Sequence, residues 1–158
     1  MLQRIQTIFL ALTIIGMGVF VSFPVWTKIA AGGDQQASLT ALELKHQLNT
    51  VQSNIDSVPY LLILAIIIAG VAAFSIIKFR NRILQSALCA VNSILMSTLL
   101  GLVIYLTFYK GAKLFDPQIQ GDYTIGFYGL VASMLANVMA NRYIRKDEKT
   151  VQQSNRLR

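Results

Sequence analysis

Four long stretches of the sequence contain no Asp, Glu, Lys, Arg or His, and they constrain the fold more than any other feature. They cover residues 5–27, 57–77, 83–109 and 123–141, which are 23, 21, 27 and 19 residues. An α-helix rises about 1.5 Å per residue, so even the shortest stretch reaches about 28 Å, close to the thickness of the hydrocarbon core of a bilayer. The sequence therefore predicts an all-α membrane protein, an antiparallel bundle of four transmembrane helices forming a single domain over residues 1–158.

A soluble bundle and a cleaved signal peptide are the alternative interpretations. The helices of a soluble bundle alternate apolar and charged faces, whereas these stretches are apolar or weakly polar all round, and only 13% of the chain is charged. The stretch 5–27 follows Arg4, as the core of a signal peptide would, but it exceeds the usual length of about 7–15 residues. No clean small-x-small cleavage site precedes Lys28. We therefore expect this stretch to remain as a span.

The basic residues gather on one side of the predicted bundle. Short loops rich in Lys and Arg stay in the cytoplasm. Ten of the 14 Lys and Arg residues share that side, namely Arg4, Lys78, Arg80, Arg82, Arg142, Arg145, Lys146, Lys149, Arg156 and Arg158. The opposite side holds five of the seven acidic residues. Both termini are therefore expected in the cytoplasm. Membrane topology explains the net charge of +7, and no nucleic-acid motif accompanies that charge.

The connections differ in length. The turn 78–82 is short enough to make the second and third spans antiparallel neighbours. The outer loop 28–56 has apolar residues at helical spacing, and Thr40 followed by Glu43 fits a capping box. These features predict a short amphipathic helix, although the alternation within 39–44 also suits a strand. Aromatic residues that favour the headgroup layer mark the predicted outer ends of the spans: Trp26, Tyr60, Phe108, Tyr109 and Tyr123.

The sequence has few groups that could carry out chemistry. His46 is alone in the outer loop, Cys89 lies within the third span, and neither has companions at metal-ligand or catalytic spacing. An enzyme would have to place its reactive groups in the outer loop or in 110–122, and neither segment shows such a cluster. We therefore expect no catalytic residues, no metal and no cofactor, and we do not expect an enzyme.

Neutral polar and small residues occur within the spans. Polar residues such as Asn92 and Asn137 favour hydrogen bonds between helices over a polar transport pathway, since no span contains an ionisable residue at its centre. Small residues recur every fourth position, as at Ala69 in the second span and Ser97 in the third. These four residues are therefore predicted to pack the helices together.

The cytoplasmic tail carries a basic stripe. Arg142, Arg145, Lys146 and Lys149 follow the i, i+3, i+4, i+7 pattern of one helical face if the fourth span continues past the membrane. They can anchor the chain beside anionic lipid headgroups. Asp147 and Glu148 are the only acidic residues on this side, and pairing with Arg4, Arg80 or Arg82 would fasten the tail beneath the bundle.

The chain resembles, from end to end, an uncharacterised bacterial family of four-span inner-membrane proteins, domain of unknown function family 4293. The resemblance rests on the opening 1–7, on the turn 81–85, and on the tail 141–148 with its last residues 156–158. It implies four helices and a multi-pass place in a bacterial inner membrane, without an activity. We expect a structural or accessory component that contacts the bilayer and another membrane protein or itself. The alternative is a small transporter or channel component.

Overall fold

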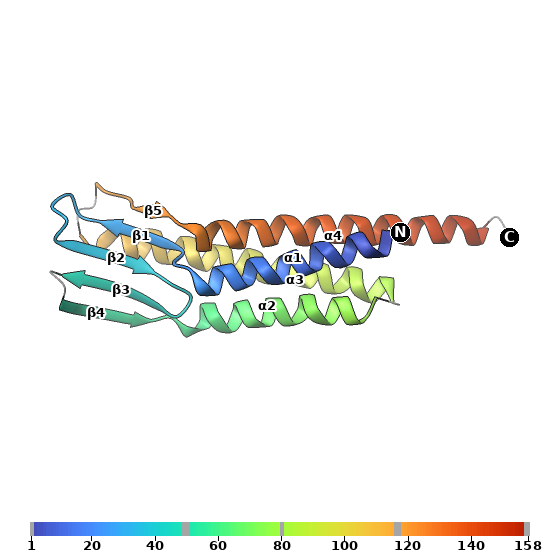
Figure 1. The fold of residues 1–158 in the computed structure, drawn as a ribbon, viewed down its shortest axis with the longest axis horizontal. Coiled ribbons are helices and arrows are strands. Elements are labelled where there is room, and N and C mark those ends of the chain that lie inside the picture. The colour runs from blue at the N-terminus through green and yellow to red at the C-terminus, as the bar shows by residue number, and fades with distance from the viewer. Residues whose placement is uncertain (1, 49–50, 80, 116–117, 157–158) are drawn as a thin grey trace.

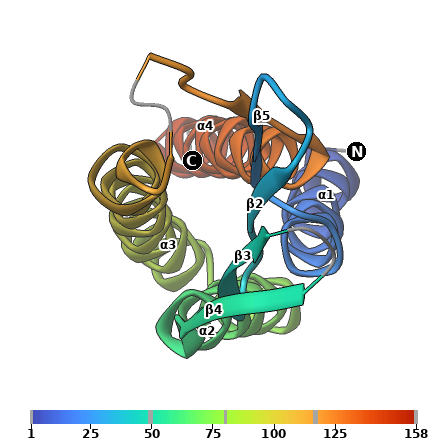
Figure 2. The same cartoon turned by 90° about the vertical axis from the view of Figure 1, so that its left-hand side faces the viewer.

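The computed structural model describes residues 2–48, 51–79, 81–115 and 118–156, and it is mostly helical. The four α-helices run antiparallel to their neighbours and form a ring when viewed along the bundle (Figures 1 and 2). Their bounds are Leu2–Ser22 for α1, Pro59–Ile77 for α2, Arg82–Tyr105 for α3 and Ile125–Arg156 for α4. Within the described residues, three helical segments are long and apolar enough to cross a membrane, Ile5–Ser22, Pro59–Ile77 and Arg82–Lys113. The predicted fourth span, 123–141, does not reach that level of hydropathy.

The bundle exposes large apolar side chains around its outside. Ile15, Ile66, Ile94 and Leu135, one on each helix, are 60–67% exposed. Such surfaces are costly in water and favourable in lipid. The exposed apolar surface and the three apolar helices together indicate association with a membrane.

The prediction of an all-α fold is wrong at one end of the bundle, where the chain forms a five-stranded antiparallel sheet (Figure 1). The strand order is β4-β3-β2-β1-β5, so the last strand, which follows α3, lies beside the first. The strands are β1 (Trp26–Ile29), β2 (Gln35–Leu39), β3 (Glu43–Leu48), β4 (Val51–Ser57) and β5 (Asp122–Tyr123).

The predicted amphipathic helix in 28–56 is therefore replaced by strands. Thr40 and Glu43 cap a β-turn instead of a helix: the Thr40 hydroxyl accepts from the Glu43 N–H at 3.2 Å, and the Thr40 N–H donates to the Glu43 carbonyl at 2.9 Å. The alternation within 39–44 comes from the end of β2 and the start of β3, where Leu39 pairs with Leu44. Pairing with neighbouring strands overrides the helical spacing in this segment.

The first helix ends at Ser22, earlier than the predicted boundary of 27. Pro24 has no N–H to continue the helix, and the chain enters β1 two residues later. Trp26 is consequently not at a lipid-facing span end, as its position in the sequence predicted, since it is 1% exposed inside the core.

Lys28 joins the sheet to the end of α3. After α3 the chain continues as a π-helical turn, η1 (Leu106–Lys110), and a 3-10 turn, η2 (Gly111–Lys113). Lys28 is 1% exposed, and its ammonium donates to the carbonyls of Ala112 and Phe115 and lies 4.8 Å from the Phe115 ring centroid. A cation is favourable at the C-terminal end of a helix, where carbonyls lack partners. This contact attaches β1 to the end of the third helix.

Candidate functional site

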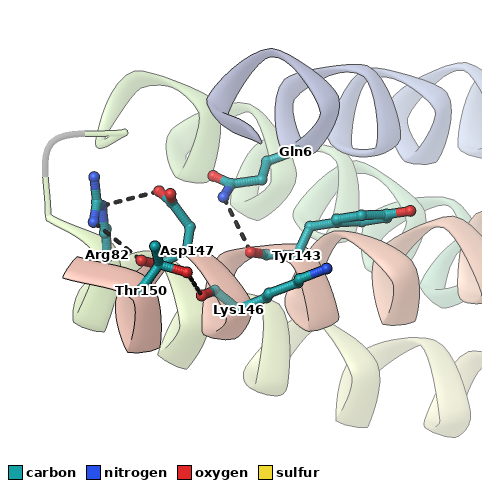
Figure 3. Close-up of polar contacts among 6 residues, drawn as sticks. All are labelled: Gln6, Arg82, Tyr143, Lys146, Asp147 and Thr150. Atoms are coloured by element: carbon teal, nitrogen blue, oxygen red, sulfur yellow. Dashed lines mark hydrogen bonds and ion pairs between the residues drawn. The ribbon is translucent and has the colours of Figure 1, made fainter. Parts of the chain in front are cut away.

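The end of the bundle opposite the sheet contains an ion pair between α3 and α4 (Figure 3). Nε of Arg82, the first residue of α3, lies 3.2 Å from Oδ2 of Asp147, and Arg82 Nη1 also donates to the Asp147 carbonyl at 3.4 Å. The side chains are 25% and 12% exposed. One of the pairings that the sequence suggested for Asp147 is therefore present, while Arg80 lies outside the described residues.

A second contact at this end involves α1. Gln6 is buried, and its side-chain amide donates to the Tyr143 carbonyl of α4 at 3.3 Å (Figure 3). Thr150, one turn beyond Lys146, donates to the Lys146 carbonyl at 3.0 Å. Helix α4 continues past the ends of the other three helices (Figure 1). Helix α4 is thus tied to both α1 and α3 before it extends beyond them.

The basic stripe of the tail lies on an exposed face of α4. Arg142, Arg145, Lys146 and Lys149 are all exposed, whereas Ile144 and Asp147 on the opposite face are buried. Arg4 lies in the first turn of α1, and Glu148 is partly buried. The helix therefore separates a basic, solvent-facing side from a side that packs against the bundle.

The first turns of α3 also approach this stripe. Ser86 donates to Oδ1 of Asn141 at 2.9 Å, and Arg145 Nε donates to the Ser86 hydroxyl at 3.4 Å. One exposed arginine of the stripe is therefore oriented by a hydrogen-bond chain between the two helices.

The middle of the same helix pair contains a buried amide network. Asn137 is 0% exposed, and its Nδ2 donates at 2.9 Å to both the Cys89 carbonyl and the Ser93 hydroxyl. Asn92, 1% exposed, donates to Oδ1 of Asn137 at 3.5 Å. Both asparagines thus form hydrogen bonds between α3 and α4, the arrangement their positions predicted.

The two small residues predicted to pack helices have different positions. Ala69 is partly buried and packs against the core. Ser97 is exposed, and its hydroxyl donates to the Ser93 carbonyl of its own helix at 2.9 Å. The packing prediction for Ser97 is therefore wrong within this chain, because the face of α3 that meets its neighbours carries Asn92 and Met96 instead.

The closest helix contact, between α1 and α4, was not predicted. The Ser133 hydroxyl of α4 shares its proton between the carbonyls of Thr13, at 3.1 Å, and Gly129, at 2.9 Å. An added Cβ on Gly16 would meet the Gly129 carbonyl at 2.8 Å. The spacing of Gly129 and Ser133, two small residues four positions apart, is a signal that could have revealed this contact.

The single histidine lies in β3, and the single cysteine lies in α3. His46 Nε2 lies 3.2 Å from Oε1 of Gln35, and its ring stacks on Phe115 with centroids 5.5 Å apart. Cys89 is buried, with its sulfur 4.0 Å from the Ser75 hydroxyl. Among the described residues, no three His, Cys, Asp or Glu side chains are grouped to hold a metal ion.

Two comparisons bear on the chain. The profile of a family described as Domain of unknown function (DUF4293) matches residues 2–157. No curated protein matches the chain.

Proposed function

We propose that this chain, which belongs to the DUF4293 family, spans a bacterial cytoplasmic membrane four times and acts as a structural or accessory component that binds another membrane protein or a second copy of itself. The observation that carries the proposal is the exposed basic face of α4. This face continues beyond the bundle and is held in place by the pair of Arg82 and Asp147.

The fourth span is supported by the pairing of α4 with α1. Near the sheet, the Gly126 N–H donates to the Pro24 carbonyl, and at the opposite end Gln6 reaches the Tyr143 carbonyl. Ser133 contacts Thr13 between these two points. If α1 crosses a bilayer, the part of α4 between residues 126 and 143 lies at the same depth. Its lower hydropathy comes from its asparagines and serine. These residues are turned inward, so they do not prevent the helix from crossing the bilayer.

The orientation follows from which charges share an end. Both termini lie at the end away from the sheet (Figure 1). The same end holds the described basic residues that the positive-inside rule assigns to the cytoplasm: Arg4, Lys78, Arg82, Arg142, Arg145, Lys146, Lys149 and Arg156. The sheet then faces the opposite side of the membrane.

The basic face can bind in two ways. Each Lys or Arg near an anionic lipid surface contributes about 1 kcal/mol, so the four exposed residues can hold the helix beside the headgroups. The last turns of α4 project past the other helices (Figure 1) and present charge to a protein partner.

Site-specific crosslinking in native membranes tests the proposal. A photoreactive residue in place of exposed Lys149 should capture one discrete protein, either a partner or a second copy of the chain. The matched control places the same residue at exposed Gln36 of the sheet and should not capture that product. Lipid adducts alone at position 149 would contradict a binding partner at this face.

A transporter or channel component is the second candidate, favoured by two buried acceptor atoms. Gln85 Oε1 and Asn92 Oδ1 lie inside the bundle on one face of α3 and have no hydrogen-bond partner among the described residues. A polar pathway would use such groups. Reconstituted protein should then conduct a small solute or ion, and Asn92→Leu should abolish that flux. Equal flux in wild-type and Asn92→Leu vesicles would contradict this candidate.

A further inference from the structure

Trp26 is held rigidly where the sheet meets the end of α3. An added Cβ on Gly111 or on Gly121 would lie 2.7 Å from the indole ring, so two glycines enclose the ring. Gly121 has a φ of +71°, which also favours glycine. The indole N–H donates to the Gln120 carbonyl at 3.2 Å. The ring therefore has one orientation and forms a fixed wall.

A cavity of about 110 Å³ lies beside this wall, lined by Trp26, Thr107, Phe108, Ala112, Gln120, Gly121 and Tyr123. The π-helical turn η1 supplies Thr107 and Phe108. Interruptions of this kind in an α-helix occur frequently at functional sites. Phe108 and Gln120 are exposed at the rim, whereas Thr107 is 4% exposed.

The inner walls of the cavity offer hydrogen-bond acceptors. The Thr107 hydroxyl donates its proton to the Ile104 carbonyl at 2.9 Å, so the Tyr123 hydroxyl, 3.3 Å away, donates to Thr107. The Trp26 N–H is engaged by Gln120. A hydroxyl oxygen has two lone pairs, so both oxygens keep acceptor capacity. These lone pairs favour a ligand that donates a hydrogen bond.

Charge disfavours an ammonium group as that donor. None of the lining side chains is ionisable near neutral pH. The buried ammonium of Lys28 lies behind the cavity wall, where it donates to the carbonyl of Ala112 at 3.1 Å. A second positive charge in the cavity would be repelled by this ammonium. Charge therefore favours an uncharged donor.

We propose that this cavity binds the hydroxyl end of a small neutral alcohol, either free or as part of a membrane amphiphile. The hydroxyl donates to the Tyr123 oxygen while its carbon atoms contact the indole ring and Phe108. The volume limits the bound part, because a cavity of about 150 Å³ accommodates benzene. A group of about two to four carbon atoms therefore fits.

Fluorescence measures occupancy directly, since Trp26 is the only tryptophan in the chain. Trichloroethanol, a small alcohol whose chlorine atoms quench indole emission on contact, serves as the probe for purified protein in detergent. We expect saturable quenching by trichloroethanol and at least about twofold weaker apparent affinity for trichloroethane, which lacks the hydroxyl. Linear quenching by both compounds would overturn the proposal and leave only water in the cavity.

Two variants and a control separate binding from folding. Ala112→Leu fills the cavity and should convert saturable quenching to linear quenching, while Ala87→Leu on an exposed face of α3 should keep it saturable. Tyr123→Phe removes one acceptor with little change of shape and should weaken apparent affinity about two- to tenfold. Unchanged affinity in Tyr123→Phe would overturn the proposed orientation even if Ala112→Leu fails to fold. Competition by phosphatidylglycerol in vesicles would identify a lipid hydroxyl as the source, and its absence would identify a free alcohol.

Discussion

A Cβ atom on Gly16 of α1 would lie 2.2 Å from the hydroxyl oxygen of Ser133 on α4, so these two residues set the distance between the two helices. The same hydroxyl donates back to the Thr13 carbonyl of α1 at 3.1 Å. Close backbone approach and hydrogen bonds between helices both stabilise membrane bundles. The alignment of α1 with α4 therefore depends on two features: Gly16 has no side chain, and the hydroxyl of Ser133 faces it.

The first prediction concerns this contact. Gly16→Ala should force the helices apart or displace Ser133, and it should lower the free energy of unfolding by about 1–3 kcal/mol. Thermal unfolding in detergent measures the change. Gly18→Ala is the matched control, because its added Cβ meets no atom within 4 Å and alanine favours a helix. Equal stability of the two variants would contradict a close packing role for Gly16.

The second prediction concerns the buried amides. Asn137→Ala removes three hydrogen bonds and leaves Asn92 without its partner, so it should lower stability by about 1–2 kcal/mol at the usual strength of such bonds in membranes. Ser97→Ala should change stability little, because the exposed Ser97 hydroxyl bonds only within its own helix. Chemical unfolding in mixed micelles compares the two. Similar losses of stability in both variants would contradict the prediction that the buried amide contributes more to stability than the exposed hydroxyl.

The third prediction concerns topology. Gln36→Cys in the sheet and Lys149→Cys in α4 are exposed positions at opposite ends of the molecule. An impermeant maleimide should label the first in intact cells and the second only after permeabilisation, since basic segments stay in the cytoplasm. The native Cys89 is buried and should remain unlabelled. The same labelling pattern for both positions would contradict an odd number of crossings between them.

The helices could be located from the sequence because their signal is local. The absence of charge over 57–77 and 83–109 predicted helices close to the observed α2 and α3. Asn81, which ends the turn between them, caps α3 by accepting from the Leu84 N–H at 3.2 Å. The absence of charge, the length of a stretch and its capping residue all lie within or beside the helix itself. The position of a helix can therefore be read from its own segment of the sequence.

The sheet could not be predicted because its signals are distant or misleading. Trp26 in β1 pairs with Tyr123 in β5, which lies beyond two complete helices in the sequence. The core-facing Lys28 interrupts the apolar pattern that would indicate a buried strand position, and its carbonyl partners follow α3. Tertiary contacts of this range are absent from local periodicity.

The candidate site was predicted in part. Asp147 is one of two acidic residues among many basic ones in the tail, and this pattern predicted that it pairs with an arginine. The structure contains its pair with Arg82. The glycine contact between α1 and α4 was missed because a small residue that faces lipid looks the same in sequence as one that faces a helix: Gly16 packs tightly whereas Gly18 is open. Only the relative rotation of the helices separates the two.

The last prediction concerns the ion pair at the end of the bundle opposite the sheet. Asp147→Asn removes the charge that faces Arg82 while keeping the size of the side chain, so the last turns of α4 should open more often. A partly buried pair worth about 1 kcal/mol should make opening about fivefold more frequent. Trypsin digestion of inside-out vesicles measures this rate, because Arg145 and Lys149 become cleavable when the helix opens. Topology by cysteine labelling should be unchanged.

Reversal of the charges provides the control. The double variant Arg82→Asp, Asp147→Arg restores opposite charges across the same two helices, so it should recover most of the protection lost in Asp147→Asn. Arg82→Asp alone places two carboxylates together and should open the tail more than Asp147→Asn does, since like charges repel at short range. If all three variants keep the cleavage rate of the wild-type protein, the pair does not fasten the tail. The basic stripe would then hold α4 through lipid contacts alone.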